Sequence, residues 1–243
     1  MTHCNTDGML FSSHGRRQLH ADFNGGRLIT DAGVLLLREA DQRLKLSQGL
    51  AAAITDPRDP AKIEHDQQTL LAQRLFAIAC GYEDLNDHHQ LRTDPALQIA
   101  TDQPPTNDQP LGSPPTLSRL ENRISRQDCW RMHQVFVERF IASFKAPPEQ
   151  LVLDFDATDD PLHGQQEGRF FHGYYDHYCY LPLYVFCGDE LLAAYLRPSN
   201  IDPSKHTRAI LKLLVKRLRE VWPQVQVIVR ADSGFCRWRG RAR

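Results

Sequence analysis

The sequence predicts two parts: a mainly α-helical region over residues 1–145, then an α/β region over residues 146–243 with the order β-β-β-α-β. Two observations lead to this division. Apolar residues recur at intervals of three and four through the first part, which is typical of amphipathic helices. Ala146-Pro147-Pro148 then interrupts the pattern, and the apolar runs that follow have the length and composition of strands.

Several segments of the first part carry helix signals. A helix is expected over residues 32–46 and another from Asp59 at its N-cap, with Pro60 next, to Gly81. Residues 101–115 contain five prolines and predict an exposed linker or a long loop.

A further helix is expected to end at Phe144. Ser118 and Glu121 have the spacing of a capping box near its start. An apolar stripe along it is interpreted as a packed core face, and consists of Trp130, Val137, Ile141 and Phe144.

In the second part, strands are expected over residues 151–156, 178–187, 190–197 and 225–231, with Gly188-Asp189 as a tight hairpin turn. A helix should open at Asp202-Pro203 and run to about residue 221. Basic residues three or four positions apart share one face of it and are candidates for contacts with DNA phosphates: Lys205, Arg208, Lys212, Lys216 and Arg219. A solvated helix face is an equal alternative.

Composition excludes some classes of protein. The 243 residues are 41% hydrophobic and 24% charged, and they contain no apolar run near the roughly 20 residues of a membrane span. The N-terminus lacks the features of a signal peptide, and the six cysteines form no CxxC pair, so a reducing, cytoplasmic location is expected. The net charge of −1 means that any DNA-binding surface must be local.

Carboxylates gather at the ends of two expected strands. Alternation places Asp154 and Asp156 on one face of the first strand, opposite its buried apolar residues, and Asp232 ends the last strand. Two such carboxylates suit Mg²⁺ or Mn²⁺, and a pair of ions can activate water at a phosphodiester. Aspartates at strand ends also serve as turn residues, and spacing alone leaves both interpretations open.

The segment between the first two strands offers two further hypotheses. His163, His172, His177 and Cys179 do not have the spacing of paired zinc ligands, so a zinc site is disfavoured. Tyr174 and Tyr175 could stack on bases, but burial within a hairpin is the favoured interpretation.

Several long stretches resemble one known family. They are LDFDATDDPLHGQQEG, FFHGYYDHYCYLPLYVF and VIVRADSGFCR, with GGRLITDAGVLLLREADQRL and QRLFAIACGYEDLNDHHQLRTDPALQIA in the first part. Together they span roughly residues 20–238 and resemble the DDE-type transposases of bacterial insertion sequences, DDE domain group 1. The resemblance implies a ribonuclease H-like domain with two Mg²⁺ or Mn²⁺ ions. It also implies a cytoplasmic, nucleoid-associated protein that binds terminal inverted repeats through residues 1–145 and forms a homo-oligomer when active.

The resemblance also implies roles for particular residues. Asp232 matches the second acidic residue of the DDE triad. Asp156 matches the first, because relatives carry Asp-x-Thr here and Asp156-Ala157-Thr158 supplies it; Asp154 is the alternative. No acidic residue follows Asp232, so the expected catalytic glutamate is missing. The chain is expected to be truncated and inactive alone as a DNA-cleaving and strand-transferring enzyme. The alternatives are a catalytically dead DNA-binding regulator and an unrelated metal-dependent nuclease or phosphatase.

Overall fold

The computed structural model describes residues 9–14, 16–21, 29 and 31–235. The chain divides into two compact units, Met1–Ala51 with Asp56–Arg123 and Ala52–Thr55 with Ile124–Arg243. The division therefore falls near residue 124 and not at the expected residue 145. The reason is that the helix over Arg126–Ser143 (α7) packs onto the sheet of the second unit through Val137 and Phe140.

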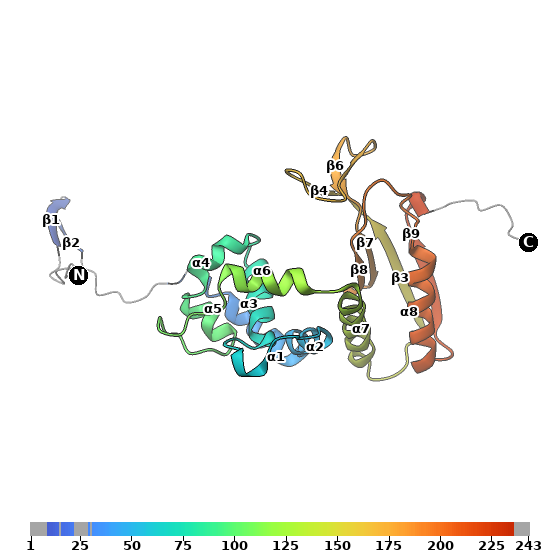
Figure 1. The fold of residues 1–243 in the computed structure, drawn as a ribbon, viewed down its shortest axis with the longest axis horizontal. Coiled ribbons are helices and arrows are strands. Elements are labelled where there is room, and N and C mark those ends of the chain that lie inside the picture. The colour runs from blue at the N-terminus through green and yellow to red at the C-terminus, as the bar shows by residue number, and fades with distance from the viewer. Residues whose placement is uncertain (1–8, 15, 22–28, 30, 236–243) are drawn as a thin grey trace, which may run out of the picture. The chain divides into compact units, whose positions relative to one another are not determined.

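The N-terminal unit is mainly helical, as expected, apart from a hairpin of β1 (Met9–His14) and β2 (Arg17–Ala21). Its other elements, some visible in Figure 1, are α1 (Val34–Leu44), α2 (Leu46–Ala53), η1 (Pro60–Lys62), α3 (Gln67–Ala79), η2 (Leu85–Asp87), α4 (His88–Leu91), α5 (Pro95–Ala100) and α6 (Pro114–Arg123). The helix expected over 32–46 is divided at Lys45, whose φ of 53° is left-handed and ends α1.

Two predicted helix starts were wrong. Asp59 caps only the short turn η1, and the chain is then extended at Ile63; the long helix α3 begins after Asp66, whose carboxylate accepts from Thr69 N at 2.7 Å. Ser118 lies inside α6, which already starts at Pro114. The capping box is formed instead at α7, by Ser125 and Asp128.

The proline-rich segment is a loop but not a linker. Residues 101–113 contain no helix or strand, yet Leu111 is buried in the core of the N-terminal unit. The amide Nε2 of Gln98 donates to the carbonyl of Thr106 at 2.7 Å and to that of Gln109 at 3.3 Å. These bonds hold the loop against α5.

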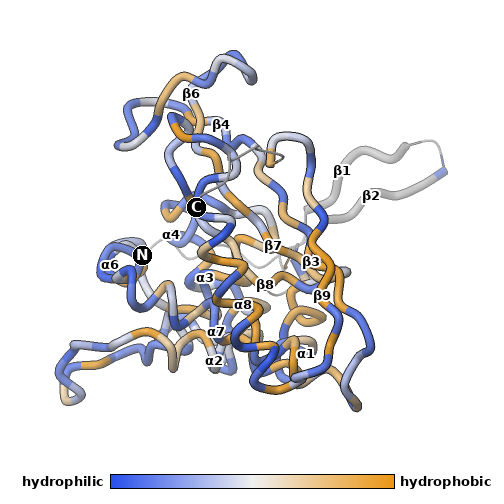
Figure 2. The backbone as a smooth tube through the Cα atoms, turned by 90° about the vertical axis from the view of Figure 1, so that its right-hand side faces the viewer, coloured by the Kyte–Doolittle hydropathy of each residue, from blue (hydrophilic) through white to orange (hydrophobic). Residues whose placement is uncertain are grey.

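The C-terminal unit contains the predicted β-β-β-α-β order. Its four-stranded sheet consists of β3 (Gln150–Ala157), β7 (Leu183–Cys187), β8 (Glu190–Tyr195) and β9 (Gln226–Ala231), in the order β8-β7-β3-β9. β9 runs parallel to β3 and the other pairs are antiparallel. The predicted helix is α8 (Thr207–Val221), but it begins at Thr207 and not at the predicted Asp202-Pro203, because residues 203–206 form a turn. Gly188-Asp189 joins β7 to β8 as predicted. Hydrophobic stretches run along these strands (Figure 2).

The strand predicted over 178–187 is divided into two. Its first half, β6 (His177–Tyr180), belongs to a separate small sheet with β4 (Asp160–Pro161) and β5 (Phe170–His172), in the order β4-β6-β5. Leu181 and Pro182 separate β6 from β7. Pro182 has no N–H to donate to a ladder, which explains why the chain leaves one sheet before it enters the other.

The core of the C-terminal unit lies on one face of the four-stranded sheet. Side chains of α7 and α8, including Phe140, Leu214 and Leu218, cover buried residues of β3, β7 and β8. Ile141 and Phe144 pack against this core, as the predicted stripe requires, but Trp130 is 44% exposed and lines a cavity that α7 forms with β8 and α8. Among the described residues, no helix has both the length and the apolar character needed to span a bilayer.

Candidate functional site

The alternation of β3 places its carboxylates opposite the core. Leu151, Leu153 and Phe155 are 3%, 0% and 2% exposed and contact α7 and α8. Asp154 and Asp156 lie between and after them in the same strand, so their side chains project from the opposite face of the sheet. This confirms the predicted orientation of the strand.

The parallel register of β3 and β9 makes Asp156 and Asp232 neighbours. Phe155 is paired with Ala231, the last residue of β9; Asp156 is the next residue of β3, and Asp232 directly follows β9. Neighbouring strands lie about 4.8 Å apart, so the two carboxylates begin from adjacent positions at the carboxyl ends of the two strands. Both residues are exposed. Two anionic groups are therefore available to solvent at one edge of the sheet.

Asp232 is followed immediately by a tight turn, η3 (Ser233–Phe235). The carboxylate of Asp232 lies against Gly234, where an added Cβ would approach Oδ1 to 3.0 Å. The missing side chain at position 234 thus leaves room for this carboxylate above the turn.

Asp154 has a different environment from Asp156. The register pairs it with Arg230, whose Nε donates to Oδ1 and whose Nη2 donates to Oδ2 at 2.7 Å. Hydrogen bonding from this guanidinium lowers the pKa of Asp154. Both oxygens of Asp154 are engaged, whereas the described part of the chain provides no hydrogen bond or ion pair to the carboxylate of Asp156.

Asp159 is also engaged, because its Oδ2 lies 2.8 Å from Nε2 of His177. No group of three or more His, Cys, Asp or Glu side chains within residues 31–235 is arranged to share a metal ion. The residues considered for zinc therefore form no such group: His163, His172, His177 and Cys179. Within the described residues, no third His, Cys, Asp or Glu is arranged to hold a metal ion together with Asp156 and Asp232.

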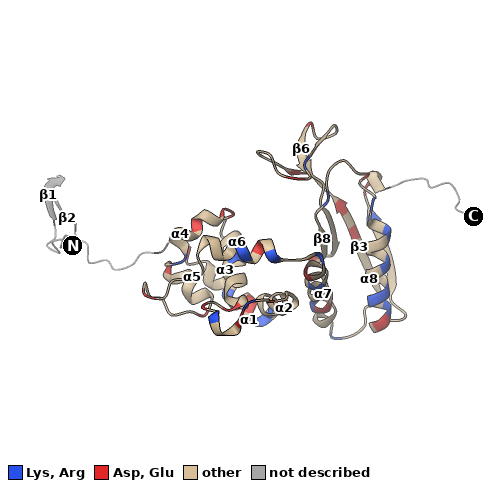
Figure 3. Ribbon diagram, in the orientation of Figure 1, with Lys and Arg blue, Asp and Glu red and all other residues tan. Residues whose placement is uncertain are grey.

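The five basic residues proposed for DNA contacts are exposed, and Figure 3 shows Lys and Arg in blue along α8. Arg208, Lys212 and Lys216 follow one another at intervals of four residues, which aligns them along one side of the helix. Lys205 lies two residues before the helix begins. Arg219 Nη1 donates to the carbonyl of Pro223 at 2.8 Å, so this side chain also closes the C-terminal end of the helix.

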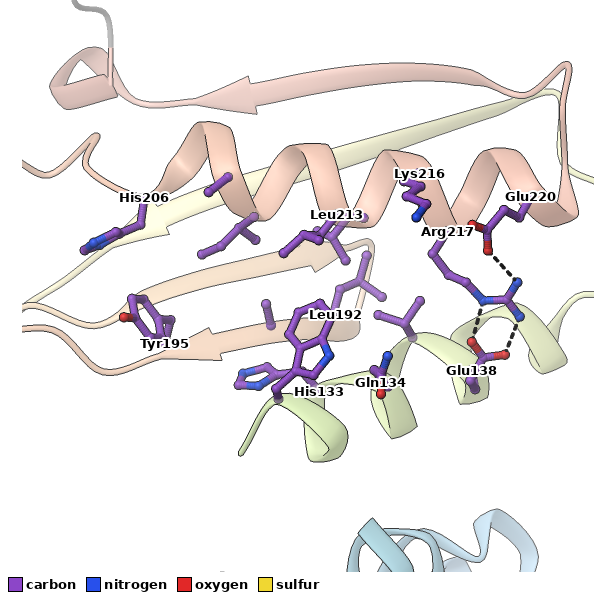
Figure 4. Close-up of a pocket in the computed structure, with 16 residues that line it drawn as sticks. His133, Gln134, Glu138, Leu192, Tyr195, His206, Leu213, Lys216, Arg217 and Glu220 are labelled. Carbon is purple, nitrogen blue, oxygen red and sulfur yellow. Dashed lines mark hydrogen bonds and ion pairs between the residues drawn. The ribbon is translucent and has the colours of Figure 1, made fainter. Parts of the chain in front are cut away.

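A separate cavity of about 410 Å³ lies between α7, β8 and α8 (Figure 4). Leu192 and Leu213 contribute to its apolar lining, and Tyr195 with His206 lies toward one end. At the other end Arg217 donates to Glu138 at 2.6 and 2.7 Å. The cavity contains neither Asp156 nor Asp232 in its lining, so it is distinct from the carboxylate pair. Sequence reasoning missed it because three elements far apart in the chain form its walls.

The favoured burial of the hairpin tyrosines was wrong for one of them. Tyr174 is 85% exposed at the turn between β5 and β6. Tyr175 is partly buried, and its ring lies 4.9 Å from the ring of His172 and 6.1 Å from that of His177. Burial raises the pKa of the Tyr175 hydroxyl.

Comparison with known proteins gave one result. No curated protein and no solved structure matched the chain. The family described as transposase DDE domain group 1 matches residues 11–240, which includes β3, β9 and nearly all of the N-terminal unit. Because this match covers most of the sequence, the chain belongs to the transposase DDE domain group 1 family.

Proposed function

We propose that this transposase cleaves and joins DNA with divalent metal ions held by Asp156 and Asp232. The observation that supports this most is the β3–β9 register, in which the residues directly before the two aspartates, Phe155 and Ala231, are paired. The ion pair with Arg230 favours Asp156 over Asp154 as the first ligand, because the oxygens of Asp154 are already occupied. The strand order β8-β7-β3-β9 agrees with the expected ribonuclease H-like domain.

The two aspartates have the right chemistry for Mg²⁺ or Mn²⁺. These hard cations take oxygen ligands, and Mg²⁺ is usually held by one or two carboxylates together with water and substrate phosphates. The exposure of both side chains leaves space for those other ligands. Bound ions, of which we expect two, would supply positive charge at the scissile phosphate and lower the pKa of an attacking water.

Other residues would position the DNA. The exposed row of Arg208, Lys212 and Lys216, with Lys205 and Arg219, can neutralise backbone phosphates of terminal or target DNA. The N-terminal unit would bind the terminal inverted repeats, and a homo-oligomer would hold both ends of the element. These roles imply a bacterial cytoplasmic protein that associates with the nucleoid.

A DNA-binding regulator without catalytic activity is the second candidate. The observation that favours it is that, among the described residues, no third His, Cys, Asp or Glu is arranged to hold a metal ion together with Asp156 and Asp232. In that case the N-terminal unit would occupy element ends, and the carboxylate pair would not support turnover.

One experiment separates the two candidates. A duplex selected from a random pool by binding to the full chain would be tested for Mn²⁺-dependent nicking by wild type, Asp156→Asn, Asp232→Asn and Asp189→Asn. Asp189 is a matched control, since it is an exposed aspartate in the β7–β8 turn. We expect all four to bind, and nicking to be lost in the first two variants and kept in the control. Binding without nicking by wild type would support the regulator, and nicking by Asp156→Asn would refute the proposed site.

A further inference from the structure

The small sheet β4-β6-β5 is attached at the edge where Asp156 lies. The chain leaves β3 after Ala157 and returns to β7 at Leu183, and these two residues are paired in the larger sheet. Asp156 is paired with Tyr184 one position before. Both connections of the small sheet therefore start beside the candidate carboxylate, and Figure 1 shows this sheet beyond the tip of β3.

The small sheet exposes large apolar side chains of one kind. Phe170, Phe171, Tyr174 and Tyr178 are 41%, 53%, 85% and 47% exposed. No leucine, isoleucine or valine of residues 158–182 is comparably exposed. Exposed apolar groups that cluster mark a binding surface. Phe171 and Tyr178 share one face of the small sheet, Phe170 lies on the other face, and Tyr174 lies at the turn. Exposed rings without exposed aliphatic side chains fit a planar partner better than a protein partner.

The rings are held in defined positions. Phe171 faces Tyr178 across β5 and β6 with ring centroids 5.7 Å apart, and the guanidinium of Arg169 lies 4.6 Å above the Tyr178 ring. At the turn, the carbonyl of His172 accepts from the N–H groups of Tyr175 and Asp176. Tyr174 contacts Tyr175 edge to face at 5.0 Å, which leaves most of its own ring open to solvent.

We propose that the β5–β6 hairpin is a base-stacking element, in which Tyr174 stacks on an unpaired DNA base near the Asp156–Asp232 edge. This inference rests on the proposed function, because it takes DNA as the substrate. Asp159, Asp160, Glu167 and Asp176 outnumber Arg169 in residues 158–182, so the hairpin supplies stacking and not attraction to phosphates. The basic residues of α8 would provide that attraction.

The test uses the full chain and a forked DNA duplex with 5-iodouracil in one unpaired arm. Long-wavelength irradiation of the complex joins this base to an aromatic side chain stacked on it, and mass spectrometry of the digested complex identifies the residue. The variants are Tyr174→Phe, which keeps the ring, and Tyr174→Leu, which keeps apolar bulk without a ring. Tyr195→Leu, at a partly exposed tyrosine in the cavity of α7 and α8, is the matched control.

We expect the cross-link to map to residue 174 in wild type and in Tyr174→Phe. Tyr174→Leu should lower its yield at least tenfold and weaken binding of the forked DNA about tenfold, the size of one base–aromatic stack. Tyr195→Leu should change neither. DNA that binds but cross-links outside residues 170–178 would overturn this inference alone. Equal binding by Tyr174→Leu and Tyr174→Phe would indicate a protein-docking surface and also overturn it. A chain that binds no DNA would overturn the proposed function as well.

Discussion

Substitution of Leu153 by alanine tests the strand orientation on which the carboxylate site depends. Leu153 is fully buried among residues from β7, α7 and α8. Removing three buried carbons and leaving a cavity should lower the free energy of unfolding by about 3 kcal/mol. Val152 is its matched neighbour, because it lies on the opposite face and is only partly buried. Val152→Ala should cost about 1 kcal/mol.

Urea unfolding followed by the fluorescence of Trp222 measures both effects, with Trp130→Phe and Trp238→Phe present in every protein compared so that Trp222 is the sole tryptophan. Trp222 belongs to the same core and its ring lies 5.1 Å from that of Phe144, so its emission reports on the C-terminal unit. With a slope of about 2 kcal/mol per molar urea, Leu153→Ala should lower the midpoint by about 1.5 M and Val152→Ala by about 0.5 M. An equal or larger effect of Val152→Ala would mean that the faces are reversed. The aspartates of β3 would then not share the exposed face.

Two other predictions concern buried polar side chains. Burial lowers the pKa of His88 from 6.5 to about 4. The unfolded state therefore binds a proton at a higher pH than the folded state does. The stability of the N-terminal unit should therefore fall as the pH drops from about 6.5 to about 4, and thermal unfolding of His88→Gln should show a flatter pH profile. Arg197 is fully buried and donates to the carbonyls of Leu181, Pro203 and Lys205. Arg197→Lys cannot reach all three, and should destabilise the C-terminal unit by about 2 kcal/mol in urea unfolding; an unchanged midpoint would contradict these contacts.

Patterns over a few neighbouring residues correctly predicted the faces of a strand and the position of a hairpin turn. The alternation of Leu151, Leu153 and Phe155 with polar residues gave the correct faces of β3, and Gly188-Asp189 gave the correct hairpin.

The predicted helix starts were wrong where more than one residue of the sequence could act as the N-cap. Asp59 and Asp66 both precede the same apolar pattern, and sequence alone does not show that Asp66 caps the long helix. Ser118 has a suitable partner three residues later, but the helix had already begun at Pro114. A cap depends on the backbone conformation before the helix, which the pattern of side chains does not reveal.

Choosing between Asp154 and Asp156 required a contact with a residue far away in the sequence. Asp154 and Asp156 have the same strand face and similar sequence surroundings. The contact that distinguishes them comes from Arg230, 76 residues later, and exists because of the parallel register of β3 and β9. The family resemblance indicated Asp156 through its Asp-x-Thr motif, and the ion pair of Asp154 provides an independent physical reason for the same choice.

The most direct test of the metal site is Mn²⁺ binding by calorimetry to wild type, Asp154→Asn, Asp156→Asn and Asp232→Asn. Our account predicts that Asp156→Asn and Asp232→Asn each raise the Kd at least tenfold, because each removes a ligand (about 1.4 kcal/mol or more). Asp154→Asn should leave the Kd within about threefold of wild type (about 0.7 kcal/mol), since its carboxylate is engaged by Arg230. Loss of binding in Asp154→Asn with binding retained in Asp156→Asn would contradict the assignment of the site.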